Sequence, residues 1–284
     1  MPEAPHVLFA VDFDEDAHDA VREAVRIATL YDAKVSLVHV MPSFWRHWIS
    51  SGLTDKQARD RLERWASKVA EQGVEASHHV LPFGNVADAL LAFAEQHEVS
   101  LIVTGAHTKS FLERQLMGQT AEAVARSAAQ SVWIRHRPPH EDLQRVLCGV
   151  DGSASSRRAL EEAARICQRS KAALTIVSAI GDPTPHPLDL SEAEAQALAE
   201  EHKQRHSQEI EAFVGDCDLG EVDARRAHVW GHPWEVLLNM AQDENYDLVV
   251  VGRTGAGRVR RVVIGGTAER FLRRAPCSVL IIGS

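Results

Sequence analysis

The chain has little cysteine and no long apolar run, and both shortages exclude classes of protein. Its four cysteines do not form a single Cys-x-x-Cys pair, so neither a disulfide framework nor a thiolate zinc site is expected. No apolar run approaches the ~20 residues that a membrane-spanning helix needs. The first residues also lack the basic start and apolar core of a leader. We therefore expect a cytoplasmic protein without a membrane partner.

Motifs of the common catalytic sites are missing too. The sequence contains no Gly-x-x-x-x-Gly-Lys-Ser/Thr phosphate loop, no Gly-x-Ser-x-Gly elbow and no His-Glu-x-x-His pair. Among its 15 histidines, His78 and His79 would point to opposite faces of a strand and could not hold one metal ion together. The formal net charge of −9 argues against a nucleic-acid partner. We expect neither catalysis nor a metal site.

What the sequence does contain is a repeated layout. Two glycines, an Ala-Glu pair and a Ser-Val pair recur at one offset of 147 positions: Gly105 and Gly252, Gly118 and Gly265, Ala121-Glu122 and Ala268-Glu269, Ser131-Val132 and Ser278-Val279. Chance does not keep one offset across four landmarks, so the chain is an internal duplication. At 284 residues it is long enough for two domains. The polar, proline-broken segment 135–142 suits a linker, and we predict domains at 1–139 and 140–284.

Each half alternates strand and helix signals. The apolar runs His6–Val11 and Arg145–Val150 read as buried strands, and residues at helical spacing follow each of them. Four more strands are predicted in each half, in matching pairs: 34–40 and 173–180, 75–81 and 223–229, 100–104 and 247–251, 131–134 and 278–282. Strands that alternate with helices of ~10–15 residues indicate parallel sheets with right-handed crossovers. The expected fold class is α/β.

The second copy of the repeat carries glycines spaced to hold an anion. Gly252 follows a predicted strand, at the edge of the sheet where ligands bind, and Gly255 and Gly257 permit positive φ angles in the loop that follows. Gly265-Gly266 then precede a helix predicted to begin near Thr267, whose N–H groups favour phosphate. Four arginines lie between the two glycine clusters with no acid among them: Arg253, Arg258, Arg260 and Arg261. In an acidic chain this local excess favours a polyanionic ligand.

Each of these features also has a plain structural interpretation. A Gly-x-x-Gly spacing is usually only a turn, and a run of arginines is usually a solvated face. Asp12 and Asp151, which end the first strand of each half, could merely cap turns. Trp45 and Trp48 could line a ligand cleft or cover the contact between domains. The residues alone leave these alternatives open.

The spacing of the second copy resembles that of a known family. Gly252-x-x-Gly255, nine residues, and then Gly265, followed by a helix and a closing strand, resemble the nucleotide loop of the universal stress protein family. Three further runs are similar to that family: Val11-Asp12, Val150-Asp151-Gly152-Ser153 and Ala275-Pro276-Cys277-Ser278-Val279-Leu280. The resemblance covers nearly the whole chain, as a tandem pair. It implies two flavodoxin-like domains, each a five-stranded parallel sheet with helices on both faces, packed as a pseudo-twofold pair.

The resemblance also implies a site for ATP or a related adenine nucleotide, with Mg, in the second domain. By position, Asp151 would approach the adenosine moiety, and Ala179 or Ile180 would contact the adenine. Four glycines would line the phosphate path: Gly252, Gly255, Gly265 and Gly266. The family's nucleotide binders usually carry Ser or Thr directly after the glycine at Gly265. Here Gly266 stands in that place and Thr267 follows, so a hydroxyl contact is lost or displaced.

The first domain departs further from the family pattern. Thr108 stands where the second glycine of the loop belongs, and Gln119 stands where the hydroxyl belongs. A β-branched residue resists positive φ. The N-terminal site is therefore expected to be degenerate, and that half to serve mainly as a built-in partner for the other.

Three hypotheses of function remain. The leading one is a stress-response sensor or regulator that binds ATP in its C-terminal domain and passes occupancy on as a conformational or partner-binding signal. An alternative is a non-nucleotide-binding interaction protein of the same fold, favoured by Gly266 and the altered first loop. A slow ATPase rests on analogy alone. The sequence does not decide whether two chains pair further into a homodimer.

Overall fold

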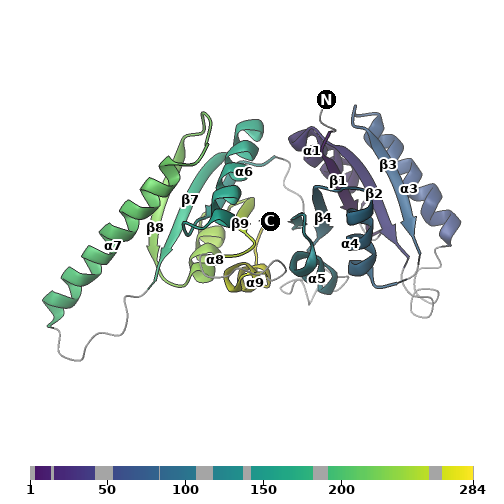
Figure 1. Cartoon of the computed structure of the whole chain (residues 1–284). Helices are drawn as coiled ribbons and strands as arrows, with labels where there is room; N and C mark the ends of the chain where they lie inside the picture. The colour runs from purple at the N-terminus through teal and green to yellow at the C-terminus, as the bar shows by residue number, and fades with distance from the viewer. Residues whose placement is uncertain are drawn as a thin grey trace. The chain divides into compact units, whose positions relative to one another are not determined.

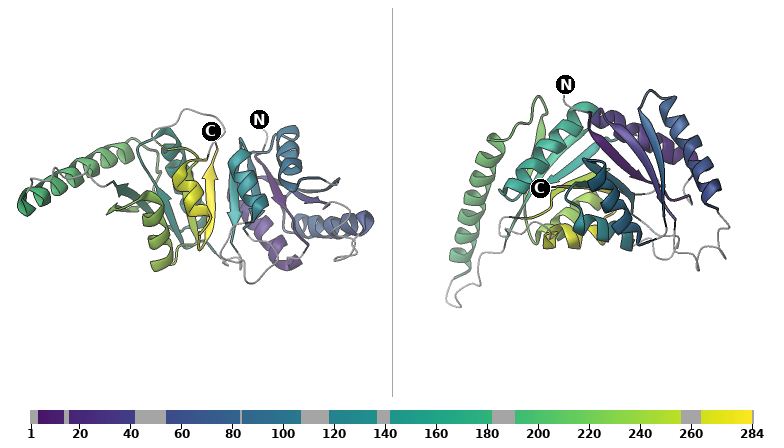
Figure 2. Two further views of the ribbon diagram at one scale, coloured as in Figure 1. Left: turned by 90° about the horizontal axis from the view of Figure 1, so that it is seen from below. Right: turned by 45° about the vertical axis from the view of Figure 1, so that its right-hand side comes forward.

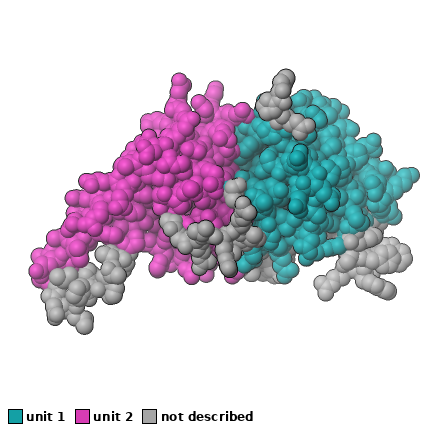
Figure 3. Space-filling view, in the orientation of Figure 1, with its two compact units in different colours: residues 1–139, 283–284 teal, residues 140–282 magenta. Residues whose placement is uncertain are grey.

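The chain forms two compact units. The computed structural model describes residues 4–13, 16–41, 54–82, 84–106, 118–136, 142–181, 191–255 and 264–283. One unit comprises Met1–Pro139 together with Gly283–Ser284, and the other comprises His140–Ile282 (Figure 3). Each unit contains five parallel strands, which confirms the predicted α/β class with five-stranded parallel sheets. The packing of the two units as a pseudo-twofold pair stays a prediction.

In the first unit, strands and helices alternate from end to end. Its elements are β1 (His6–Ala10), α1 (Ala17–Tyr31), β2 (Lys34–Val40), α3 (Asp55–Ala70), β3 (Ala76–Leu81), α4 (Val86–Gln96), β4 (Leu101–Gly105), α5 (Gln119–Ser127) and β5 (Ser131–Arg135). The strands lie in the order β3-β2-β1-β4-β5, all parallel. Helices α1 and α3 pack together on one face of the sheet, and α4 and α5 pack together on the other (Figures 1 and 2).

The second unit repeats this plan. Its elements are β6 (Arg145–Gly149), α6 (Ala154–Ser170), β7 (Ala173–Ile180), α7 (Glu192–Gly215), β8 (Ala224–Trp230), α8 (Pro233–Asp243), β9 (Leu248–Gly252), α9 (Gly266–Leu272) and β10 (Ser278–Ile282). The parallel order is β8-β7-β6-β9-β10, the same as in the first unit. The order reverses between β6 and β9, whereas a flavodoxin sheet reverses between its first and third strands. The switch point therefore lies between β6 and β9, and not between β6 and β8 as a flavodoxin-like order would have it.

Sequence features explain where the elements begin. The strands at the sheet centres are continuous apolar runs because helices cover both faces, and Val146, Leu147 and Cys148 of β6 are fully buried. Ser153 accepts a hydrogen bond from the N–H of Ser156 at 3.1 Å and starts α6. Ser191 and Glu194 form a capping box at the start of α7. The carboxyl ends of β6 and β9 are thus followed by a capped helix and a glycine loop, respectively.

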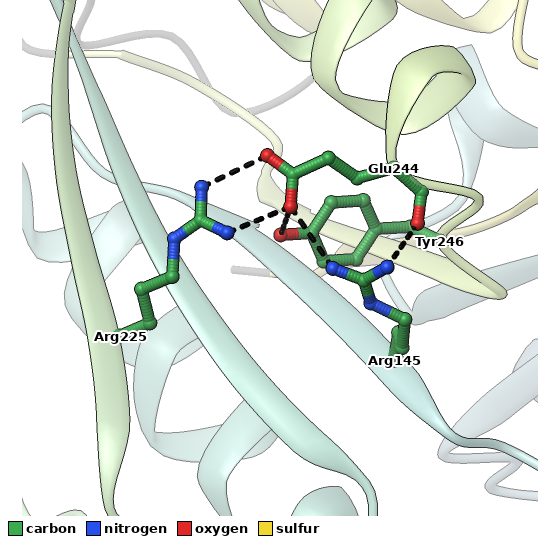
Figure 4. A network of polar contacts seen from close by, with 4 residues as sticks. All are labelled: Arg145, Arg225, Glu244 and Tyr246. Carbon is green, nitrogen blue, oxygen red and sulfur yellow. Dashed lines mark hydrogen bonds and ion pairs between the residues drawn. The ribbon is translucent and has the colours of Figure 1, made fainter.

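Four side chains tie the amino ends of β6 and β8 to the turn after α8 (Figure 4). The Glu244 carboxylate accepts two hydrogen bonds from Arg225, both at 2.8 Å, and one from Arg145 at 2.9 Å. The hydrogen bond from Arg225 holds the pKa of Glu244 below its ordinary value. The Arg145 guanidinium also lies 4.9 Å from the centre of the Tyr246 ring. The network fixes the edge of the sheet opposite the one where ligands of such sheets bind.

Candidate functional site

A cavity of about 330 Å³ opens at the carboxyl ends of the second unit's strands. Its lining comes from three strand ends, the first turn of α6, the beginning of α8, and the glycine segments after β9 and at the start of α9: Gly149, Val150, Asp151, Ser156, Val177, Ala179, Pro233, Val236, Leu237, Val251, Gly252, Arg253, Thr254, Gly255, Gly265, Gly266, Thr267 and Ala268. The cavity lies where β6 and β9 meet, which is the switch point at which ligands of open α/β sheets bind. The predicted residues are therefore brought together, with one exception described below.

Asp151 lies directly across from Gly255. A Cβ atom added to Gly255 would stand 2.7 Å from Oδ2 of Asp151, closer than any ordinary contact. The Oδ1 atom of the same carboxylate accepts a hydrogen bond from the N–H of Ser153 at 3.1 Å, and the N–H of Asp151 donates to Ser156 Oγ at 3.3 Å. These bonds fix the aspartate at the rim of the cavity. Its carboxylate therefore faces both the cavity and the loop after β9.

The reason for glycine at position 255 differs from the expected one. Gly255 does not take a positive φ angle; the glycines with positive φ in the described part of the chain are Gly73, Gly152, Gly220 and Gly231. The chain therefore does not use the positive φ that glycine permits at this position. The absence of a side chain matters there because it leaves room for the Asp151 carboxylate. Gly257 lies outside the described residues.

Gly252 lines the cavity, and packing against α6 requires a glycine there. A Cβ atom there would stand 2.5 Å from Ser155 Oγ and 2.7 and 2.8 Å from the carbonyl carbon and oxygen of Ser155. Ser155 is buried in the first turn of α6, and its hydroxyl accepts a hydrogen bond from the N–H of Thr254 at 3.4 Å. Sequence reasoning missed Ser155. Its only signal in the sequence is the run of small residues Gly152-Ser153-Ala154-Ser155-Ser156.

The second glycine pair starts α9 at the cavity. The N–H of Gly265 donates to the carbonyl of Arg253 at 2.7 Å, and this bond closes the loop between β9 and α9. The helix begins at Gly266, one residue before the predicted start, and Thr267 also lines the cavity. A Cβ atom at Gly266 would meet nothing within 4 Å. The position at which the resemblance implied a Ser or Thr is therefore open space here.

The apolar wall of the cavity narrows one prediction. Ala179, at the end of β7, lines the cavity, whereas Ile180 is fully buried and is not part of the lining. Neighbouring residues of a strand point to opposite faces of the sheet. The prediction that Ala179 or Ile180 contacts an adenine therefore narrows to Ala179. Val236 and Leu237 of α8 complete this wall and are buried. Neither was predicted from the sequence as a site residue.

One of the four predicted arginines can be placed. Arg253 lines the cavity but is only 3% exposed, and burial lowers the pKa of its guanidinium below the ordinary value. Arg258, Arg260 and Arg261 lie outside the described residues, as do Trp45, Trp48 and Thr108. The basic cluster as a whole therefore stays a prediction.

The first unit has the same loop framework. The N–H of Gly118 donates to the carbonyl of Ala106 at 2.7 Å, which matches the bond from Gly265 to Arg253. Gln119 begins α5 where Gly266 begins α9. The backbone bond that closes the loop is therefore shared by both units. The loss of ligand binding in the first unit stays a prediction.

Comparison with known proteins identifies both halves. A sequence model described as the Universal stress protein family matches residues 4–136 and 143–283. A universal stress protein of Mycobacterium tuberculosis is 23% identical over 285 residues, covering 93% of this chain and 94% of that protein. The crystal structure of a universal stress protein from Archaeoglobus fulgidus has a TM-score of 0.67 at 19% identity and covers 99% of both chains. A second structure from that organism, in complex with dAMP, is 26% identical, covers 46% of this chain and 97% of that one, and has a TM-score of 0.35.

The described residues contain neither a candidate membrane span nor a candidate metal centre. None of the helices placed in the structure combines the length and apolar character that a membrane crossing requires. Within the same residues, no three His, Cys, Asp or Glu side chains are grouped so that they could hold a metal ion.

Proposed function

The chain belongs to the universal stress protein family, with one family domain in each half, and from this premise we propose that its second unit binds ATP or a related adenine nucleotide. The bound or empty state of that site would then act as a stress-response signal, passed on by a change in conformation or in partner binding. We further propose that the protein binds without catalysing a reaction and acts in the cytoplasm.

The observation that carries the proposal is the composition of the cavity at the switch point. Its volume of about 330 Å³ falls at the lower end of the range of small-molecule sites, ~300–1,000 Å³. Three kinds of surface meet in it, and each suits one part of a nucleotide. Ala179, Val236 and Leu237 offer an apolar wall to a flat base, and the carboxylate of Asp151 can accept a hydrogen bond from a ribose hydroxyl.

The third surface is backbone that carries no side chain. Gly252, Gly255, Gly265 and Gly266 line the cavity, so a phosphate could approach the main chain between β9 and α9 closely. Such N–H groups bind phosphate oxygens without needing a lysine. Mg²⁺ is usually bound through substrate phosphates and one or two carboxylates rather than by an all-protein cage, so we propose that Mg enters the site with the phosphates.

Native mass spectrometry tests the proposal most directly. Protein purified without added nucleotide should retain a mass that matches an adenine nucleotide, or should gain one when Mg-ATP is supplied. We expect about one nucleotide per chain. The second unit has glycine at both loop positions, Gly252 and Gly255, whereas the first unit has Thr108 in the place of the second glycine. If no nucleotide is retained and calorimetry with Mg-ATP gives no heat of binding, the interaction-protein hypothesis replaces this one.

Adding a hydroxyl at Gly266 should tighten binding. The Cβ position there is open, so Gly266→Ser can be made without displacing a neighbour. One hydrogen bond to a charged phosphate contributes roughly 1.5–3 kcal/mol, which corresponds to ~10-fold or more in affinity. Calorimetry with Mg-ATP measures the change. Gly266→Ala is the matched control, because it adds the same Cβ without the hydroxyl, and its affinity should stay at the parent value.

Thr267 offers the competing explanation for the missing hydroxyl. Thr267 directly follows Gly266 and also lines the cavity, so its hydroxyl could already contact the phosphates. In that case Thr267→Ala would weaken binding, and Gly266→Ser would add nothing. Equal tightening by Gly266→Ser and Gly266→Ala would contradict the hydroxyl argument altogether.

A further inference from the structure

Helix α7 is long but is buried only near its carboxyl end. It has 24 residues, and Ile210 and Val214 are its buried ones. Helix α3 takes the corresponding place in the first unit, between the second and third strands, and with 16 residues it buries five: Ala58, Leu62, Trp65, Ala66 and Val69. Figures 1 and 2 show α7 running along β8, the outermost strand of its sheet, and projecting past it. The part of α7 before Ile210 therefore has little cover from its own unit.

The two exposed large apolar side chains of the described residues lie together at this part of α7. Leu198 of α7 is 43% exposed, and Trp230, the last residue of β8, is 38% exposed. The ring of His202 lies 5.8 Å from the ring of Trp230, and Leu198 is one helical turn before His202 on the same side of α7. We call Leu198, His202 and Trp230 the α7 patch. Single exposed apolar residues are normal, but two that the fold gathers from separate elements indicate a contact surface.

The charges that border the α7 patch are mainly negative. Residues 192–201 contain four glutamates and neither lysine nor arginine: Glu192, Glu194, Glu200 and Glu201. Lys203 and Arg205 follow in the next turn, and Arg205 is already paired with Glu201 at 2.7 Å. The border towards the amino end of α7 therefore carries a net negative charge.

This combination of apolar anchors and acidic border selects among possible partners. Apolar and aromatic anchors inside a polar border are the usual anatomy of a protein–protein contact. The glutamates would repel nucleic acid and anionic lipid headgroups. A second copy of the chain would place the same patch against itself in a twofold contact, so that glutamates would face glutamates. A partner with a basic border avoids these conflicts.

We propose that the α7 patch is a docking surface for a basic amphipathic helix of another protein. The apolar side chains of that helix pack on Leu198 and Trp230, and its lysines or arginines lie against the glutamates of residues 192–201. A helix fits because the side-chain rows of α7 offer ridges and grooves to a second helix. The proposal does not depend on nucleotide binding.

Fluorescence anisotropy with the full chain, without nucleotide, tests the proposal. The probe is a labelled synthetic peptide of about 18 leucine and lysine residues, with the leucines at helical spacing. We expect it to bind, and a scrambled peptide of the same composition to bind ~10-fold more weakly, because scrambling removes the apolar face. The same pattern built from leucine and glutamate should not bind. Equal binding of the ordered and scrambled lysine peptides would overturn the proposal.

Three variants assign the binding to the α7 patch. Leu198→Gln removes an apolar anchor and keeps a good helix former at an exposed position, so the chain should stay folded and bind the lysine peptide ~10-fold more weakly. Glu200→Lys should weaken binding as well. Glu63→Lys, at an exposed position of α3, changes the net charge by the same amount outside the patch and should bind like the parent.

Two results with these variants would contradict the proposal. If Glu63→Lys weakens binding as much as Glu200→Lys, the net charge of the chain attracts the peptide and the α7 patch is not its site. Sedimentation of the parent chain addresses the other occupant. Self-association that Leu198→Gln abolishes would assign the patch to a second copy of the chain instead of a basic partner.

Discussion

Gly255→Val is expected to lower the affinity for Mg-ATP by at least ~100-fold, roughly 2.7 kcal/mol, while leaving the second unit folded. The Cβ atom would stand 2.7 Å from Oδ2 of Asp151, so the two groups cannot keep their present positions. Because the carboxylate is the far end of a flexible side chain, it can rotate away at small cost to stability. Rotation breaks the hydrogen bond from Ser153 and takes the carboxylate out of its place at the cavity rim.

Calorimetry on the full chain measures this loss of affinity, and two further variants serve as a control and as an intermediate case. Gly266→Ala adds a Cβ to the same cavity where nothing lies within 4 Å, so it should bind like the parent. Asp151→Asn keeps the shape of the side chain but weakens the acceptor, and we expect an intermediate loss. Parent-like affinity of Gly255→Val would mean that the nucleotide does not pass between Asp151 and the loop, and the assignment of the site would have to be withdrawn.

The sequence predicted the strands well because a buried parallel strand leaves a short apolar signal. Strands β2, β7 and β10 match the predicted limits, and the other strands differ by a residue at one or both ends. The end of β9 and the start of α9 were also predicted to within one residue, since a glycine directly after an apolar run marks the end of a strand. These features depend on neighbouring residues, which a single sequence shows directly.

The reasons for the glycines could not be predicted in the same way. Gly252 faces Ser155, in the first turn of α6, and Gly255 faces Asp151, just before that helix. Both partners lie about a hundred residues earlier in the sequence. Only the fold brings them within contact distance. Local reasoning therefore offered backbone conformation as the cause at Gly255, where the structure shows a close approach between side chain and main chain.

The histidines show the same limit for polar networks. His206 and His228 both lie within hydrogen-bond distance of Ser178, and the sequence gives no sign of this, because histidine has no preference strong enough to reveal a partner. Their connection through Ser178 needs the register of β7 against β8, in which Ser178 lies opposite His228. Pairings between strands are non-local, so a sequence without related sequences beside it gives no sign of them.

Gly252→Val should destabilise the second unit itself, by about 3 kcal/mol, the upper end of the usual cost of overpacking. Its Cβ would stand 2.7 Å from the carbonyl carbon and 2.8 Å from the carbonyl oxygen of Ser155. These are backbone atoms in the first turn of α6, so relief requires moving the helix away from β9. The contrast with Gly255, whose obstacle is a side chain that can rotate, makes the two variants a matched pair.

Hydrogen exchange of β6, β9 and α6 measures the stability of the second unit without assuming that the two units unfold together. In Gly252→Val the protection of these elements should fall toward the level of their surface turns, whereas in Gly255→Val it should match the parent. Combining Gly252→Val with Ser155→Ala removes the contact with Ser155 Oγ at 2.5 Å but leaves both backbone contacts, so little stability should return. Full recovery in the double variant would show that the Ser155 hydroxyl, and not the backbone of α6, sets the requirement for glycine.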